Sequence, residues 1–238
     1  MKTVLITGGS RGIGRECVRL FAKRGYNVAF TYNKSEEAAK RLSEECGALA
    51  IKADSQREDE IISAVKLVKE NYCGIDILVN NAAVSSFSLF TDLSLDEWNR
   101  TFDVSVTGAF LYSRECLCDM INRKWGRIIN ISSMWGVTGA SCEVHYSAAK
   151  AALIGMTKAL AKEVGPSGIT VNAIAPGVIN TDMNKAISEQ DMQTLKEETP
   201  VCRIGEPSEV AEAVLYLAGD AASFITGETL NINGGFVI

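Results

Sequence analysis

The stretch Thr3–Gly14, TVLITGGSRGIG, joins a short apolar run to a glycine-rich turn. Val4–Thr7 has the length and composition of a buried strand, and the amphipathic stretch Ile13–Arg24 predicts a helix directly after the turn. A turn of this kind lets the backbone bend sharply and lets a pyrophosphate approach the helix N-terminus. Its three spaced glycines are Gly8, Gly12 and Gly14. The stretch therefore predicts the first strand and helix of a nucleotide-binding α/β fold.

Similar apolar runs recur along the chain and alternate with stretches of helix length. The predicted strands are Val4–Thr7, Val28–Tyr32, Ala48–Lys52, Ile75–Asn80, Arg127–Ser132, Thr170–Ala175 and Thr229–Ile232. The predicted helices are Ile13–Arg24, Ser35–Glu45, Gln56–Asn71, Leu95–Lys124, Val144–Val164 and Pro207–Ala218. This alternation predicts a single α/β domain over residues 1–238, a doubly wound (Rossmann) parallel sheet of about seven strands with helices on both faces.

The bulk composition narrows the class of protein. The chain has 238 residues, 47% of them hydrophobic, which is ample for one large core. A formal net charge of −5 argues against binding to nucleic acid, which favours a basic face. No apolar run reaches the roughly 18 residues that a membrane-spanning helix needs, so we expect a cytoplasmic protein. The seven scattered cysteines and the single histidine lack the spacing of a metal site, and we expect none.

Two side chains four residues apart point to chemistry at a carbonyl group. Tyr146 and Lys150 lie in a predicted helix, where positions i and i+4 share a face. The ammonium group can then favour the ionised form of a phenol whose ordinary pKa is about 10. Ser133 follows a predicted strand thirteen residues upstream of Tyr146. This combination indicates a carbonyl reductase or an alcohol dehydrogenase.

The motifs occur in the order found in the short-chain dehydrogenase/reductase family, which the chain resembles over nearly its whole length. The matching segments are Thr7–Gly14, Asn80–Ala83, Ser133, Tyr146–Lys150 and Pro176–Gly177. The resemblance implies that Tyr146 transfers a proton and that Lys150 lowers the pKa of Tyr146 and binds the nicotinamide ribose. It implies that Ser133 donates a hydrogen bond to the carbonyl oxygen.

One family position differs in this chain. Ser105 stands where the family usually has the asparagine of a proton relay. A serine is shorter and offers one hydroxyl in place of an amide. We therefore expect retained but slower turnover, with Ser105 as a fourth catalytic position.

The expected cofactor is NADP(H). The strand Val28–Tyr32 is followed by no acidic residue that could hold a free ribose 2′-hydroxyl, whereas Arg11, Lys34 and Ser35 could hold a 2′-phosphate. Lys34 could instead be a solvated surface charge, and Asp54 could cap the next helix rather than meet the adenine. The full set of expected cofactor contacts is Gly8, Ser10, Arg11, Gly12, Ile13, Gly14, Thr31, Asn33, Lys34, Ser35, Asp54, Ser55, Asn81, Ala82, Ala83, Tyr146, Lys150, Pro176, Gly177, Ile179 and Thr181.

Two narrower resemblances suggest different ketones. Gly165–Asn172, Arg203–Gly205 and Ile225–Leu230 are similar to 3-oxoacyl-[acyl-carrier-protein] reductases, which implies a 3-oxoacyl thioester on an acidic carrier protein. Trp135–Val144 is similar to elongation factor P 5-aminopentanone reductases, which implies a ketone on a modified lysine of that protein. We rank the acyl reductase first. A catalytically weakened dinucleotide-binding regulator, a reading that only Ser105 supports, is the alternative from another class.

Charged side chains bear on this choice. Arg123, Lys124 and Arg127 form a basic cluster that could meet an acidic carrier protein or could be a solvated helix end. Glu143 could bind an ammonium group of the substrate or could be a solvated carboxylate at a helix start. His145 adjoins Tyr146, and we expect a structural role for it.

The last expectations concern a lid and the assembly. The polar segment 180–205 follows a predicted strand end, where ligands bind in such folds, and is a candidate substrate lid. A solvated pair of surface helices is the alternative. The family resemblance also implies a homotetramer, assembled through the helices near 95–124 and 144–164 and the C-terminal strand.

Overall fold

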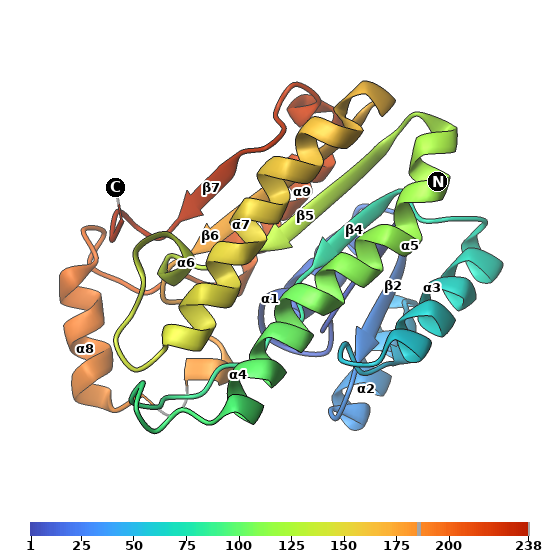
Figure 1. Cartoon of the computed structure of the whole chain (residues 1–238). Coiled ribbons are helices and arrows are strands. Elements are labelled where there is room, and N and C mark those ends of the chain that lie inside the picture. Colours follow the sequence, from blue (N-terminus) through green and yellow to red (C-terminus); the bar gives the residue numbers. More distant parts are fainter. Residues whose placement is uncertain (185–186, 238) are drawn as a thin grey trace.

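The computed structural model describes residues 1–184 and 187–237 and contains a sheet of seven parallel strands (Figure 1). The order across the sheet is β3-β2-β1-β4-β5-β6-β7. The strands are β1 (Thr3–Ile6), β2 (Asn27–Tyr32), β3 (Leu49–Lys52), β4 (Ile77–Asn80), β5 (Gly126–Ile131), β6 (Ile169–Pro176) and β7 (Thr229–Ile232). The predicted doubly wound α/β fold is confirmed, and each strand begins and ends within two residues of its predicted range.

Helices cover both faces of the sheet (Figure 1). One face carries α1 (Gly12–Lys23), α2 (Glu36–Cys46) and α9 (Pro207–Ala218). The other face carries α3 (Glu58–Tyr72), α5 (Gly108–Arg123) and α7 (Val144–Val164). The shorter helices lie beyond the carboxyl ends of the strands: α4 (Leu95–Phe102), α6 (Trp135–Thr138) and α8 (Glu189–Glu198). Single turns of 3₁₀ helix occur at Gly165–Ser167, Asp182–Asn184 and Asp220–Ala222.

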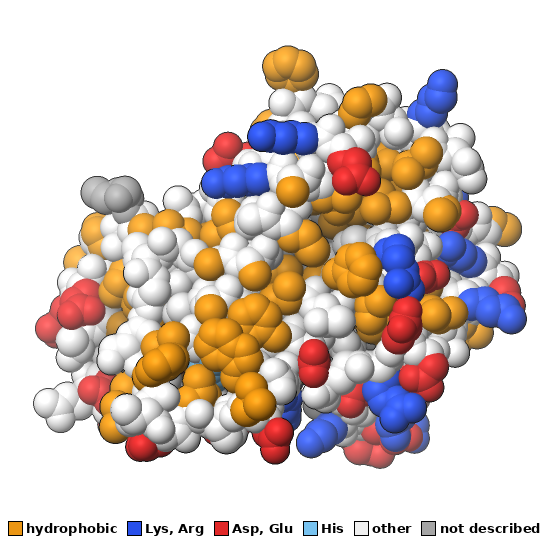
Figure 2. Space-filling view, viewed as in Figure 1, with side chains coloured by type: hydrophobic (Ala, Val, Ile, Leu, Met, Phe, Trp, Pro, Cys, Tyr) orange, Lys and Arg blue, Asp and Glu red, His pale blue; other side chains and the backbone are white. Residues whose placement is uncertain are grey.

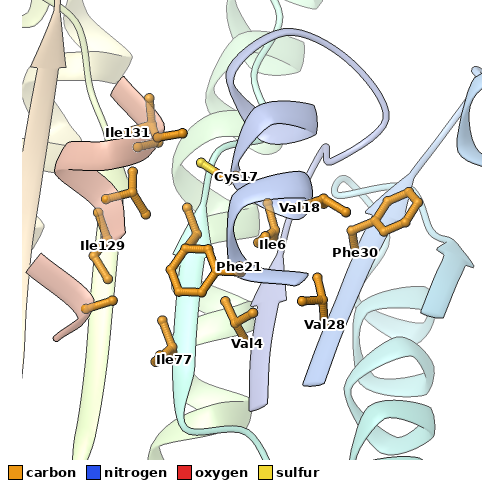
Figure 3. Packing of buried hydrophobic residues seen from close by; sticks show 14 of the residues in the cluster. Val4, Ile6, Cys17, Val18, Phe21, Val28, Phe30, Ile77, Ile129 and Ile131 are labelled. Carbon is orange, nitrogen blue, oxygen red and sulfur yellow. The ribbon is translucent and has the colours of Figure 1, made fainter. Parts of the chain in front are cut away.

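Successive residues of one strand enter the two cores in turn. Val4 and Ile6 of β1 lie against Phe21 of α1 (Figure 3), whereas Leu5 belongs to the core on the opposite face. Side chains of a strand point alternately to its two faces, so a strand covered on both sides needs an apolar residue at every position. This requirement explains why the strands read as nearly continuous apolar runs.

The strand order reverses between β1 and β4, which are neighbours in the sheet although β2 and β3 separate them in the chain. Ligands bind beyond the carboxyl ends of the strands at such a switch point. The Thr7 amide donates to the Val79 carbonyl oxygen at 3.0 Å, which carries the β1–β4 pairing up to the start of the glycine turn. The fold therefore places that turn at the crevice.

The predicted single helix Leu95–Lys124 is wrong in one respect, because a π-helical segment, Asp103–Thr107, separates α4 from α5. A Cβ atom at Gly108, the next residue, would lie only 2.9 Å from the Ser55 carbonyl oxygen. The chain therefore passes close to the turn after β3 at this point. A π-helical turn adds a residue to the helix and changes which side chains face that neighbour.

Candidate active site

A cleft of about 1400 Å³ lies at the carboxyl ends of the strands. Turns that follow β1, β2, β3, β4, β5 and β6 all contribute to it, together with α4, α7 and α8. The predicted residues that line it are Gly8, Ser10, Arg11, Gly12, Ile13, Thr31, Asn33, Lys34, Ser35, Asp54, Ser55, Asn81, Ala82, Ala83, Ser133, Tyr146, Lys150, Pro176, Gly177, Ile179 and Thr181. Two predicted residues, Gly14 and Ser105, are not among the lining residues of the described chain. The fold therefore places the predicted catalytic and cofactor residues either in the wall of one cavity or, for Gly14 and Ser105, directly beside lining residues.

The glycine turn has a backbone that other residues rarely adopt. Gly8 and Gly12 have φ angles of +64° and +53°, in the left-handed region. Gly14 supports the turn from behind, since a Cβ atom there would lie 2.5 Å from the Gly8 carbonyl oxygen. The first residues of α1 follow at once, so their free amides face the cleft as a cradle for a pyrophosphate.

Asn81 ties this turn to the end of β4. Its side-chain amide donates to the carbonyl oxygens of Thr7 and Gly8 at 2.9 and 3.0 Å. The Thr7 hydroxyl accepts in return from the backbone amides of Asn81 and Ala82. The residue that resemblance assigns to the adenosine ribose thus also fixes the shape of the glycine turn.

Polar groups after β2 and β3 form the far end of the cleft. Arg11 and Lys34 are exposed there and have no ion-pair partner within residues 1–184 and 187–237. Asp54 accepts a hydrogen bond from the Gln56 amide at 3.0 Å. The N-cap of α3 is Arg57, so Asp54 shapes a turn and does not cap the helix. This end of the cleft therefore offers two cations and one carboxylate to a nucleotide.

The residues predicted to be catalytic, apart from Ser105, lie just after β5 and in α7. Ser133 follows β5, and its hydroxyl accepts from the Trp135 amide at 3.1 Å. The ammonium group of Lys150 donates to the Ile131 carbonyl oxygen at 2.8 Å and lies 5.5 Å from the centre of the Tyr146 ring. Ser132 Oγ donates to the Lys150 carbonyl oxygen at 2.8 Å and so fastens α7 to the end of β5.

Burial dominates the protonation of these groups. It raises the pKa of Tyr146 to about 12, with a further rise from the charge of Glu143 and an opposing hydrogen bond from Ser133. Burial also lowers the pKa of Lys150 to about 7. Near neutral pH the phenol is therefore protonated, which suits a proton donor. The expected lowering of the Tyr146 pKa by Lys150 is therefore wrong for this structure, because burial raises that pKa and Ser133, not Lys150, is the group that opposes the rise.

Ser105 lies in the π-helical segment, and only 2% of its surface is exposed. Its hydroxyl has no hydrogen-bond partner in the described part of the chain, although Val104 beside it lines the cleft. A buried hydroxyl without a partner is unfavourable by about 1–3 kcal/mol. The position is therefore next to the cleft but not in direct contact with it.

Glu143 is the N-cap residue of α7, lines the cleft and is only 8% exposed. The Ser85 hydroxyl donates to its Oε1 at 2.6 Å, and burial raises the pKa of the carboxyl group. The alternative of a solvated carboxylate is therefore wrong.

His145 is fully buried and does not line the cleft; its Nε2 lies 3.1 Å from Ser86 Oγ.

The basic cluster lies at the opposite end of the sheet. Arg127 is the second residue of β5, and Lys124 ends α5, whereas Ser133 follows the far end of β5. Arg123 pairs with Asp76 at 3.3 Å, and the Arg127 guanidinium stacks 4.3 Å from the centre of the Trp125 ring. None of the three cations is among the residues that line the cleft.

The segment 180–205 leaves β6 and returns beside it. Asn180 and Gly205 are joined by a hydrogen bond from the Asn180 amide to the Gly205 carbonyl oxygen at 2.9 Å. Between them, α8 contributes Asp191, Thr194 and Leu195 to the cleft. Lys185 and Ala186 of this segment lie outside the described residues.

Sequence reasoning missed several lining residues: Ser85, Phe87, Glu97, Arg100 and Asp191. The sequence carries a signal for Glu97 and Asp191, as the third residues after the N-cap serines Ser94 and Ser188, and that signal concerns the helix starts. Within residues 1–184 and 187–237, no cluster of three His, Cys, Asp or Glu side chains could hold a metal ion. Nor does that part of the chain contain a helix long and apolar enough to cross a membrane.

Comparison with known proteins identifies the family. A family model described as enoyl-(acyl carrier protein) reductase matches residues 8–237. A Serratia marcescens short-chain dehydrogenase/reductase, solved as a double mutant, superposes with a TM-score of 0.92 at 37% identity and covers 99% of this chain and 97% of that one. The chain belongs to the short-chain dehydrogenase/reductase family.

Two curated relatives carry more detailed names. A 3-oxoacyl-[acyl-carrier-protein] reductase FabG of Aquifex aeolicus is 44% identical and covers 98% of this chain and 96% of its own length. An acetoacetyl-CoA reductase of Shinella zoogloeoides is 41% identical, and 98% of both chains is covered. This short-chain dehydrogenase/reductase is therefore an oxidoreductase whose relatives reduce 3-oxoacyl groups.

Proposed function

We propose that this chain uses NADPH to reduce a ketone to a secondary alcohol and that a 3-oxoacyl thioester is its first candidate substrate. The observation that carries the proposal is the meeting of Ser133, Tyr146 and Lys150 in a cleft that also contains the glycine turn. The names of two relatives at 44% and 41% identity support the acyl substrate.

The proposed reaction assigns one task to each side chain. A bound NADPH supplies the hydride for the carbonyl carbon. The Ser133 hydroxyl donates to the carbonyl oxygen and stabilises the negative charge that develops there. Tyr146, a protonated phenol with a pKa of about 12, gives its proton to that oxygen. Lys150 holds the nicotinamide ribose by family resemblance, and its ammonium group is already oriented by the Ile131 carbonyl oxygen.

The choice of NADPH over NADH rests on the end of β2. Asn33, Lys34 and Ser35 follow it directly, and none of them carries a carboxylate. Glu36 and Glu37 come next, in α2, and do not line the cleft. With Arg11 from the glycine turn, the two cations line the same end of the cleft. A 2′-phosphate would meet these cations, whereas a free ribose hydroxyl would lack its usual acidic acceptor.

A second candidate substrate is the amino ketone carried by elongation factor P. The observation that favours it is Glu143, a carboxylate enclosed in the cleft wall three residues before Tyr146. An ammonium group on the substrate would give this carboxylate a partner.

The experiment that tests the function measures NADPH oxidation with an acetoacetyl thioester and with a β-ketoester. We expect oxidation that Tyr146→Phe abolishes while NADPH still binds. Binding of NADPH without oxidation of any ketone would instead support a dinucleotide-binding regulator. Comparison of an acyl-carrier thioester with an amino-ketone-bearing elongation factor P would then rank the two substrates.

We also propose that copies of the chain assemble as a homotetramer. Figure 2 shows hydrophobic side chains gathered over the region of α4, α5 and α7. Leu95 of α4 and Phe110 of α5 are 71% and 49% exposed. A contiguous apolar patch on a surface marks an interaction site. Analytical ultracentrifugation should give four times the mass of the chain, and a monomer would contradict this assembly.

A further inference from the structure

The turn after β7, residues 233–237, holds its own shape through short hydrogen bonds. The Gly235 amide donates to Asn233 Oδ1 at 3.0 Å, and the Phe236 amide donates to the Asn233 carbonyl oxygen at 3.2 Å. Asn233 Nδ2 donates in turn to the Val237 carbonyl oxygen at 3.0 Å. Gly235 has a φ angle of +87°, which allows the chain to bend this tightly. The turn therefore presents Phe236 in a fixed direction.

The same turn meets the candidate lid where the chain leaves α8 (Figure 1). The Val201 amide donates to the Gly234 carbonyl oxygen at 3.2 Å, and a Cβ atom at Gly234 would lie 2.7 Å from Thr199 Cγ2. The Thr199 hydroxyl donates to the carbonyl oxygen of Leu195, which lines the cleft. The turn is thus packed directly against the base of the lid.

Phe236 connects this turn to the wall of the cleft. Its ring meets the Trp135 indole edge to face, with centroids 5.6 Å apart and planes at 89°. Trp135 lines the cleft, whereas Phe236 is not among the lining residues of the described chain. Phe236 therefore touches the indole from outside the cavity. Edge-to-face contact fixes the orientation of two rings as well as their separation.

Trp135 is in turn linked to the proposed chemistry. Its amide donates to Ser133 Oγ at 3.1 Å, which leaves the hydroxyl proton of Ser133 free to donate to a substrate carbonyl oxygen. Its carbonyl oxygen accepts from the Gly139 amide at 2.8 Å, so the backbone is held on both sides. The indole, by contrast, has Phe236 as its one ring partner in the part of the chain that the structure describes.

We propose that Phe236 is a positioning residue that holds the Trp135 indole in the cleft wall and so sets the size of the group that the cleft accepts beside the ketone. The proposal rests on the ketone reduction proposed above and adds a specificity element to the same site. A smaller side chain at position 236 leaves unfilled space behind the indole, into which the ring can move. The cleft then widens beside Ser133. Bulky ketones gain room, and small ketones lose a wall that aligns them with the hydride donor.

The test compares NADPH-dependent reduction of ethyl acetoacetate, with a methyl group on the ketone, and ethyl benzoylacetate, with a phenyl group. The two ketones differ in reactivity, so the quantity compared between proteins is the ratio of their kcat/KM values. Phe236→Ala should shift this ratio about threefold or more toward the phenyl ketone, in line with the loss of one aromatic contact. A higher KM for the methyl ketone should account for much of the shift. Phe236→Tyr keeps the ring and should keep the wild-type ratio.

Further variants separate positioning from general damage. If Phe236 acts through the indole, Phe236→Ala should leave the ratio unchanged in a Trp135→Ala background. Phe224→Ala removes the same ring from a fully exposed position and should leave the ratio of the wild-type protein unchanged. Should Phe236→Ala fail to fold, Phe236→Leu loses the edge-to-face contact but keeps an apolar side chain, and it should shift the ratio in the same direction.

Two kinetic results would overturn the inference. One is an unchanged ratio in a folded Phe236→Ala or Phe236→Leu variant, and the other is an equal shift with and without the indole. Failure of the proposed function looks different, because the wild-type protein would then oxidise NADPH with neither ketoester.

The position of the indole can also be measured without turnover. The fluorescence of Trp135 is the difference between the wild-type protein and Trp135→Phe. Acrylamide should quench this fluorescence more strongly when Phe236 is replaced by alanine, and equal quenching would contradict the positioning role.

Discussion

Replacement of Lys150 by methionine should stabilise the folded protein near neutral pH while it abolishes reduction. The side chain is only 2% exposed, and burial lowers its pKa from 10.5 to about 7. The unfolded chain therefore binds one proton more than the folded chain between these two values. Stability rises with pH wherever the unfolded state binds more protons. The destabilising effect of Lys150 is thus complete below pH 7 and absent above pH 10.5.

The magnitude follows from the pKa shift. One pKa unit corresponds to about 1.36 kcal/mol, so at pH 7 the burial of an ionisable amine costs about 4 kcal/mol. At pH 9 the same cost has fallen to about 2 kcal/mol. Methionine avoids this cost but cannot donate a hydrogen bond to the Ile131 carbonyl oxygen. The loss of that bond lowers the free energy of unfolding of the variant by about 1–3 kcal/mol at every pH. The advantage of Lys150→Met should therefore shrink by about 2 kcal/mol from pH 7 to pH 9.

Urea unfolding without nucleotide, followed by circular dichroism at both pH values, measures this change. Lys158→Met, at an exposed position of the same helix, should show no such pH dependence. Groups that titrate in all three proteins cancel in the comparison. An advantage of Lys150→Met that is the same at pH 7 and pH 9 would show that Lys150 keeps its proton on folding and would refute the reasoning.

Three other substitutions test the cofactor end and the relay position. Gly14→Ala should weaken NADPH binding by about tenfold or more, because its Cβ would lie 2.5 Å from the Gly8 carbonyl oxygen and would displace the cradle; an unchanged Kd in a fluorescence titration would contradict this. Lys34→Ala should raise the Kd for NADPH about tenfold and leave that for NADH unchanged, as expected for loss of one charge-assisted contact; equal effects on both nucleotides would exclude a 2′-phosphate contact. Ser105→Asn should raise kcat in steady-state assays by restoring an amide at the relay position, and a rate that is unchanged or lower would reject that role.

The sheet could be predicted from the sequence because its signals are local. Each strand is a short apolar run, and the run is nearly unbroken since both faces are covered. The glycine turn marks the first crossover and thus the site of the crevice. The interruption Asp103–Thr107 could not be predicted in the same way, because it lies beside Gly108, whose close approach to the turn after β3 is a contact between segments far apart in the chain.

The grouping of the proposed catalytic residues in one cleft was also predictable, since Tyr146 and Lys150 share one helix and Ser133 follows a strand. The burial of Glu143 was not predictable, because it needs Ser85, which lies 58 residues away in the chain. The basic cluster shows the same limit. Arg123 and Arg127 flank a strand start, and only the direction of β5 tells which end of the sheet they occupy.

The π-helical segment has a consequence for changes in chain length. Each residue turns an α-helix by about 100°, so deletion of one residue from Asp103–Thr107 would allow regular winding but would rotate α4 by that angle relative to α5. Arg100 and Thr101 would then swing out of the cavity wall that they now form. Deletion of one residue here should therefore disrupt the cleft and leave the sheet folded. The extra residue of the π-helical segment thus sets the rotation of α4 relative to α5.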